Sequence, residues 1–246
     1  MIDIAEAKQQ LEDEGYCVLP GELDAAVAER LDEQARELMA HREGYVSMEA
    51  SLNYLPDLVP LCIHPPLMEL AESILGAGLF LANNVAMKWC KPGAPAGPLH
   101  WGGRFQQYEC LTELQVFWML TDFTEANGAT RVIPFTHHAN RSPRREAYPQ
   151  EIPVLGKKGT LFIFDGRVWH RSGANTSTTE HRMAGNMMYL PSYAERGEEW
   201  PLVTRATYDG VPPQLQSLLE RSAEPIAADA KSMDPRIWTL DDPPGT

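Results

Sequence analysis

The chain has 246 residues, of which 43% are hydrophobic and 22% charged, and its formal net charge is −13 at pH 7. This length is sufficient for one large domain with a substantial core, whereas the acidic balance argues against binding of nucleic acid polymers or anionic lipid. The sequence shows neither a membrane-spanning apolar run nor a signal-like start, so we expect a cytoplasmic protein with no membrane partner.

The first third of the chain is expected to be helical. Apolar side chains recur at helical spacing from Leu23 to Leu38, within a segment 3–41 that we expect to form helix. A shorter helix is predicted to begin at Pro65 and to end near Gly76, where glycine suits a left-handed C-terminal turn. Residues 1–76 are therefore predicted to form a helical cap.

From residue 79 onward the pattern changes to short apolar or alternating runs separated by turn-forming residues, as is typical of antiparallel strands. The runs are LFLANNVAMKW (79–89), ELQVFWMLTDF (113–123), ATRVIPF (129–135), EIPVL (151–155), GTLFIFDG (159–166) and RMAGNMMYL (182–190). Strands in series without intervening helices predict an all-β jelly-roll core at about residues 79–192. A C-terminal cover (193–246), containing a further helix PPQLQSLLERS, would complete a single domain, 1–246.

Two histidines and one arginine lie close to the ends of these predicted strands. His100 follows a Gly- and Pro-rich approach, His170 follows the strand that begins at residue 159, and Arg182 opens the last strand. Two neutral imidazoles on a rigid scaffold can hold a divalent metal such as Fe(II). A guanidinium can bind a carboxylate through two parallel hydrogen bonds.

Two longer segments, TDFTEANGATRVIPFTHH (121–138) and GKKGTLFIFDGRVWHRSGANTSTTEHR (156–182), carry a family resemblance, and EDEGYCVLPG (12–21) extends it. They closely resemble the phytanoyl-CoA dioxygenase-like branch of the Fe(II)/2-oxoglutarate oxygenases. The resemblance implies a double-stranded β-helix, a cupin-like jelly roll, with His100 and His170 as iron ligands. It also implies that Arg182 pairs with the distal carboxylate of 2-oxoglutarate and that O2 is consumed. Arg131 is a further candidate for contact with the cosubstrate.

The sequence departs from this family at Gly102. An H-x-D pattern would place there the aspartate that supplies the third, anionic ligand, and glycine cannot coordinate. Glu109, Asp122 and Glu125 do not obviously repair the loss, because they lie further along the chain. A halide would fill the open position and supply the missing charge. The H-x-G pattern is similar to that of the non-haem iron halogenases, which adds chloride to the implied cofactors.

This second resemblance implies a halogenase, an oxidoreductase of natural product biosynthesis that chlorinates an unactivated carbon of a small molecule. No carrier-protein docking surface is evident, so a freestanding substrate is expected. Residues 131–182 carry nine basic and four acidic side chains, which favours an anionic metabolite such as a nucleotide. Lys88 and Asn83, before the site, and Arg104, after it, are the candidates for substrate contact.

Two other functions stay open. The first is hydroxylation with water in the vacant position, either as the native activity or because an aspartate was exchanged for Gly102. The second is a noncatalytic binding protein that kept the barrel and lost its metal. The joint presence of His100, His170 and Arg182 argues against this second alternative.

Overall fold

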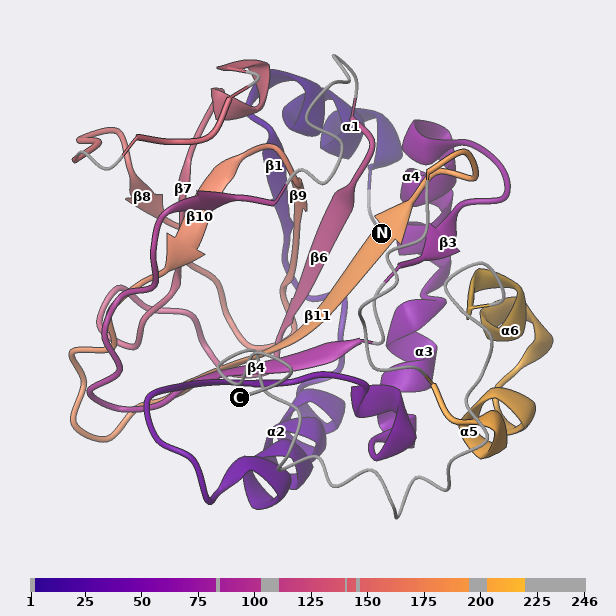
Figure 1. Ribbon diagram of the computed structural model, residues 1–246, viewed down its shortest axis with the longest axis horizontal. Helices are drawn as coiled ribbons and strands as arrows, with labels where there is room; N and C mark the ends of the chain where they lie inside the picture. Colours follow the sequence, from indigo (N-terminus) through magenta and orange to yellow (C-terminus); the bar gives the residue numbers. More distant parts are fainter. Residues whose placement is uncertain are drawn as a thin grey trace, which may run out of the picture.

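The computed structural model describes residues 3–82, 85–102, 111–139, 141–144, 147–194 and 203–219. Two antiparallel sheets pack together, and most helices lie on the side of the larger sheet that faces away from the smaller one (Figure 1). The elements in chain order are α1 (Ile4–Asp13), β1 (Tyr16–Leu19), α2 (Ala25–Met39), β2 (Tyr45–Met48), η1 (Ser51–Asn53), η2 (Pro56–Leu58), α3 (Val59–Cys62), α4 (Pro65–Leu75), β3 (Phe80–Leu81), β4 (Ala86–Cys90), β5 (His100–Trp101), β6 (Leu114–Met119), β7 (Thr130–Ile133), η3 (Thr136–Ala139), β8 (Ile152–Pro153), β9 (Leu161–Asp165), β10 (Trp169–Ser172), β11 (Arg182–Leu190), α5 (Arg205–Gly210) and α6 (Pro213–Leu219).

The larger sheet has the strand order β1-β9-β6-β11-β4-β2, with β3 paired to the end of β11, and the smaller sheet has the order β5-β10-β7-β8. All the strand pairs are antiparallel. Except for β7 and β8, the neighbouring strands are not consecutive in the chain, as in a jelly roll. The predicted all-β core is therefore confirmed.

Side chains of the central strands point alternately to the two faces of the larger sheet and so contribute to two separate apolar layers. On β6, Leu114, Val116 and Trp118 pack under the helices, whereas Phe117 and Met119 point into the space between the sheets. Successive side chains of a strand point to opposite faces, so one strand contributes to both layers. The inner face of the larger sheet is thereby free to line a site.

The expected continuous helix over residues 3–41 is wrong. Helix α1 ends before Gly15, whose φ of +86° suits a left-handed turn, and Tyr16–Leu19 then pairs with β9 as an edge strand. Strand β2 is a second strand within the predicted cap and pairs with β4. Each of these strands has only four residues. Such a short alternating pattern is weaker than the helical pattern of the neighbouring residues, so the sequence did not predict these strands.

The two shorter predicted helices are found where expected. Helix α4 begins at Pro65 and ends at Leu75, and its C-cap Gly76 has a φ of +83°. Helix α6 covers the part of the predicted C-terminal helix that lies among the described residues.

No single helix in the described ranges is long and apolar enough to span a membrane. Pro56–Cys62 and Pro65–Leu75 satisfy length and composition only as a pair, bent by 50°. Within the fold, Leu58, Leu61 and Leu67 of these segments are buried in the apolar layer beneath the larger sheet.

Replacing Tyr189 by Phe should destabilise the fold. The fully buried hydroxyl of Tyr189, on β11, donates to the Cys62 carbonyl of α3 at 2.8 Å, and we expect its loss to lower the unfolding free energy by about 1–2 kcal/mol. Urea denaturation measures the change. Tyr193→Phe is the control, because that side chain is 62% exposed, and equal midpoints for the two variants would contradict the prediction.

Candidate active site

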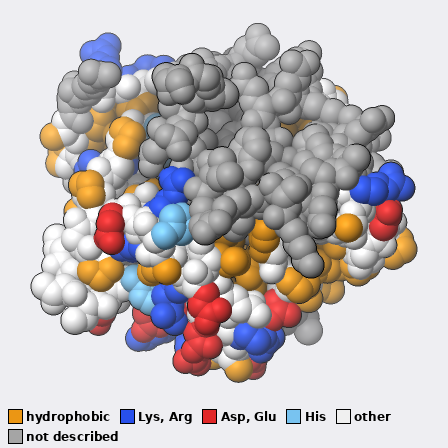
Figure 2. Space-filling view, turned by 60° about the horizontal axis from the view of Figure 1, so that its bottom comes forward, with side chains coloured by type: hydrophobic (Ala, Val, Ile, Leu, Met, Phe, Trp, Pro, Cys, Tyr) orange, Lys and Arg blue, Asp and Glu red, His pale blue; other side chains and the backbone are white. Residues whose placement is uncertain are grey.

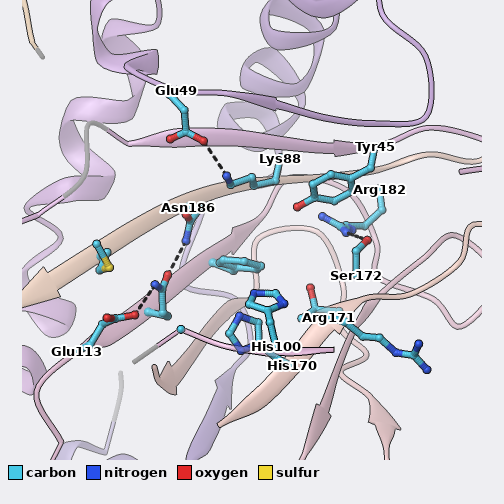
Figure 3. Close-up of a pocket in the computed structure, with 15 residues that line it drawn as sticks. Tyr45, Glu49, Lys88, His100, Glu113, His170, Arg171, Ser172, Arg182 and Asn186 are labelled. Carbon is cyan, nitrogen blue, oxygen red and sulfur yellow. Dashed lines mark hydrogen bonds and ion pairs between the residues drawn. The ribbon is translucent and has the colours of Figure 1, made fainter. Parts of the chain in front are cut away.

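A cavity of about 410 Å³ lies between the two sheets. Its walls come from β2, β4, β6 and β11 of the larger sheet and from β5, β7 and β10 of the smaller one (Figure 3). The lining residues are Tyr45, Glu49, Lys88, His100, Gly102, Glu113, Gln115, Phe117, Thr130, His170, Arg171, Ser172, Arg182, Asn186 and Met188.

The two predicted iron ligands meet at the floor of this cavity. His100 on β5 lies directly opposite His170 on β10, and their ring centroids are 4.2 Å apart. Nδ1 of His100 is bonded to the carbonyl of Pro98 at 3.0 Å, and Nδ1 of His170 to that of Val168 at 2.8 Å. If each Nδ1 donates its proton, each Nε2 keeps a lone pair for a metal, which is the usual arrangement of metal-binding histidines.

Burial keeps His170 in the neutral form that a metal requires. The pKa of His170 is lowered to about 3, first because burial disfavours the imidazolium and second because His100 lies so close. The aromatic ring of Phe164 packs edge-on against His170, with centroids 4.8 Å apart, and helps to fix its orientation. The pair therefore fits a divalent metal ion.

Arg182, the first residue of β11, is fully buried beside the histidines. Its Nε donates to the Gly128 carbonyl at 3.2 Å and its Nη2 to Ser172 Oγ at 2.9 Å, whereas Nη1 has no partner among the described groups. The guanidinium carbon lies 5.5 Å from the ring centre of Tyr45 and 5.3 Å from that of Phe123. A buried guanidinium with a nitrogen left over fits an anionic carboxylate, such as the distal one of 2-oxoglutarate.

The space beside Gly102 is not empty. A Cβ placed on Gly102 would lie 3.2 Å from Oε1 of Glu113, 3.2 Å from the Gly166 carbonyl oxygen and 3.5 Å from Cε1 of His170. Glu113 is only 1% exposed and lines the cavity. Glu113 was not among the site residues expected from the sequence. The alternation of side-chain direction could have indicated it, because Glu113 precedes β6 and has the same parity as Gln115 and Phe117, which also line the cavity.

Lys88, expected to contact substrate, does line the cavity, but its charge is paired. Its Nζ lies 2.8 Å from Glu49 Oε1 and 2.6 Å from Ser47 Oγ. Burial alone would lower the pKa of Lys88, but the carboxylate of Glu49 outweighs burial and raises it. The pKa of Glu49 is lowered: burial opposes the shift, and Lys88 overcomes it. The two side chains therefore form a charged, mutually compensated pair.

Arg131, expected to contact the cosubstrate, points away from the cavity. Its neighbour Thr130 lines the cavity, so alternation turns Arg131 outward, where its Nε donates to Glu151 Oε1 at 2.9 Å. Arg171 pairs with the same carboxylate at 2.7 Å. The structure therefore places Arg131 outside the cavity, and its expected contact with the cosubstrate is wrong.

The basic side chains between residues 131 and 182 do not gather into one anion-binding site among the described residues. Lys157 pairs with Asp122, Lys158 with Glu29, and Arg167 with Asp165, at 2.7, 3.4 and 2.6 Å. On the lower part of the face in Figure 2, basic and acidic side chains are likewise intermixed. The anionic-substrate hypothesis therefore loses the observation on which it rested.

The other candidates lie elsewhere in the described structure or outside it. Asp122 and Glu125 pair with Lys157 and Arg131, away from the histidines. Within the described ranges, no group of three His, Cys, Asp or Glu side chains is arranged to hold a metal ion. The candidates that lie outside the described residues are Asn83, Arg104 and Glu109.

Comparison with known proteins identifies a family model and several dioxygenases that resemble this chain. The model of the phytanoyl-CoA dioxygenase (PhyH) family matches residues 11–184. Dioxygenase af480 of Aspergillus fumigatus is 27% identical over 245 residues, covering 90% of this chain and 78% of that protein. Dioxygenase aneA of Aspergillus aculeatus is 26% identical, covering 86% and 80%.

Solved structures share the fold. The non-heme alpha ketoglutarate dependent epimerase SnoN from nogalamycin biosynthesis is 26% identical, with a TM-score of 0.60 over 76% of this chain and 82% of that one. HygX from Streptomyces hygroscopicus, solved with nickel, 2-oxoglutarate and hygromycin B, has a TM-score of 0.64 at 15% identity, over 76% and 87%. The chain belongs to the phytanoyl-CoA dioxygenase family and is an enzyme of the iron- and 2-oxoglutarate-dependent dioxygenase type, because the family model spans well over half of its length.

Proposed function

We propose that this enzyme uses Fe(II), 2-oxoglutarate and O2 to hydroxylate an unactivated carbon of a small organic molecule. One observation carries the proposal: two imidazoles, each bonded through Nδ1 to a backbone carbonyl, and a buried guanidinium whose Nη1 has no partner among the described groups line the same cavity. This combination suits a metal ion and a carboxylate cosubstrate side by side.

Different residues of the cavity would bind the iron, bind the cosubstrate and exclude water. His100 and His170 would hold iron through Nε2, and Arg182 would bind the distal carboxylate with Ser172 beside it. Bound iron would supply the activation of O2, with 2-oxoglutarate oxidised to succinate and CO2. The buried ring of Phe117 lines the cavity and would help to keep water from the reacting carbon.

Hydroxylation is favoured over chlorination by the groups around Gly102. The oxygen atoms of Glu113 and of the Gly166 carbonyl flank the space that a third ligand would occupy. A halide there would face two oxygen atoms that repel an anion, whereas water can donate hydrogen bonds to both. Chlorination remains the second candidate, because Gly102 itself offers no ligand.

A neutral or basic substrate fits the charges that line the cavity. With Arg182 bound to the cosubstrate, the other charged residues that line the cavity, among those that the structure describes, are the Lys88–Glu49 pair, Glu113 and Arg171, and the guanidinium of Arg171 is paired with Glu151. HygX binds hygromycin B, and SnoN was solved with nogalamycin RO, which supports a natural product as the substrate class.

Spectroscopy on the apoprotein tests the proposed reaction. Anaerobic addition of Fe(II) and 2-oxoglutarate should produce the visible charge-transfer band of the chelate, and chloride should leave it unchanged. His170→Ala should abolish the band, because one imidazole is lost. With O2, products from a natural product library should gain one oxygen atom. Chlorinated products or a chloride-dependent band would contradict hydroxylation, and no band at all would contradict the iron site.

A pair of arginine variants tests the cosubstrate site. Arg182→Gln should weaken 2-oxoglutarate binding by about 10- to 100-fold, because charge-assisted hydrogen bonds worth about 1.5–3 kcal/mol are lost. Arg131→Gln should bind as the wild type does, since Arg131 faces outward. Isothermal titration with 2-oxoglutarate and a redox-inert divalent metal measures both. Equal losses in the two variants would contradict the assignment.

A further inference from the structure

We propose that Glu113 replaces the missing aspartate as the acidic group of the iron site, and that its carboxylate keeps anions out of the space beside Gly102. This inference rests on the proposed function. Glu113 is a positioning residue rather than a ligand, because no group of three such side chains among the described residues is arranged to hold a metal.

Two glycines make a slot for this carboxylate. A Cβ on Gly166 would lie 2.5 Å from Glu113 Oε1 and 2.7 Å from its Cδ, which is closer than real atoms approach. A Cβ on Gly102 would lie 3.2 Å from the same oxygen, a tight contact. Any other residue at Gly166 would therefore displace the carboxylate, and one at Gly102 would crowd it. The absence of a side chain at Gly102 thus has a steric reason that requires no halide.

Backbone hydrogen bonds fix the three residues together. The N–H of Gly102 donates to the Gly166 carbonyl at 2.9 Å, and the N–H of Gly166 donates to the Glu113 carbonyl at 2.8 Å. Strand β5 is thereby tied, through the turn after β9, to the start of β6. The distance between the carboxylate and the histidine pair is set by this backbone, and not only by a flexible side chain.

Side-chain hydrogen bonds also orient the carboxylate. Gln115 Nε2 donates to Glu113 Oε1 at 2.9 Å, and Asn186 Nδ2 donates to Gln115 Oε1 at 3.0 Å, a chain that is visible in Figure 3. All three side chains line the cavity. Because Gln115 donates an amide N–H to Glu113, Oε1 of Glu113 is held as an acceptor next to the position of Gly102, which His170 also borders.

The electrostatic consequence follows from burial. The Glu113 side chain is 1% exposed, and the hydrogen bond from Gln115 is one of the contacts that compensate the burial of its carboxylate. A divalent ion on the neighbouring histidines would be stabilised by this negative charge, as it would be by an aspartate at position 102. The same charge repels chloride from that space. Glu113 thereby connects tighter metal binding with exclusion of anions.

The test measures metal affinity and anion response in Glu113→Gln. This variant is isosteric and can still accept from Gln115, so the fold should be retained. We expect Co(II) to bind about 10- to 100-fold more weakly, in the range found when groups that orient metal ligands are removed. We also expect chloride or azide to shift the Fe(II)–2-oxoglutarate band of the variant but not that of the wild type.

Two further variants sharpen the result. Gly166→Ala keeps the charge but pushes the flexible end of Glu113 aside, and should gain the same anion response. Glu151→Gln removes another carboxylate, whose side chain is 9% exposed and which pairs with Arg131 and Arg171, and should behave as the wild type does. Circular dichroism and thermal melting check that all variants fold.

The outcomes separate this inference from the proposed function. If the wild type forms the band and Glu113→Gln keeps wild-type Co(II) affinity without an anion response, the role of Glu113 is refuted and the iron site stands. An anion response in Glu151→Gln equal to that in Glu113→Gln would also refute it. If the wild type forms no band, both proposals fail together.

Discussion

The candidate site depends on the register between β5 and β10. His100 lies opposite His170, and Trp101 lies opposite Trp169. Because successive side chains alternate between faces, a slip of one residue would replace an imidazole at the cavity floor by an indole. Strand β7 pairs with all four residues of β10 from its other side, which fixes this strand against such a slip. The placement of the two histidines side by side is therefore a product of sheet geometry.

The larger sheet performs two tasks with the same strands. One face of β6 and β11 contributes apolar side chains to the layer beneath the helices, while the other contributes Gln115, Arg182 and Asn186 to the cavity. Burial of the first face stabilises the strands that position the second. The rigid support matters because a metal and its cosubstrate require placement within a fraction of an ångström.

The charges of the site are nearly balanced locally. Lys88 is compensated by Glu49, and Arg171 turns outward to Glu151. The buried guanidinium of Arg182 keeps one nitrogen without a partner among the described groups. Among the described residues, five basic side chains of the 131–182 segment (Arg131, Lys157, Lys158, Arg167 and Arg171) are paired with carboxylates, some inside this segment and some outside it. A count of charges along the sequence therefore overstated the positive field at the cavity.

The sequence by itself determined the strand series of the jelly roll, because alternation is a local signal, and its motifs singled out His100, His170 and Arg182, which the structure brings to one cavity. It did not predict β1 and β2, because these four-residue segments are strands only through their pairing with β9 and β4. It also did not reveal that Glu113 fills the space beside Gly102. That contact joins two segments across the ends of different strands, so only the tertiary structure, through register and close backbone approach, could decide it.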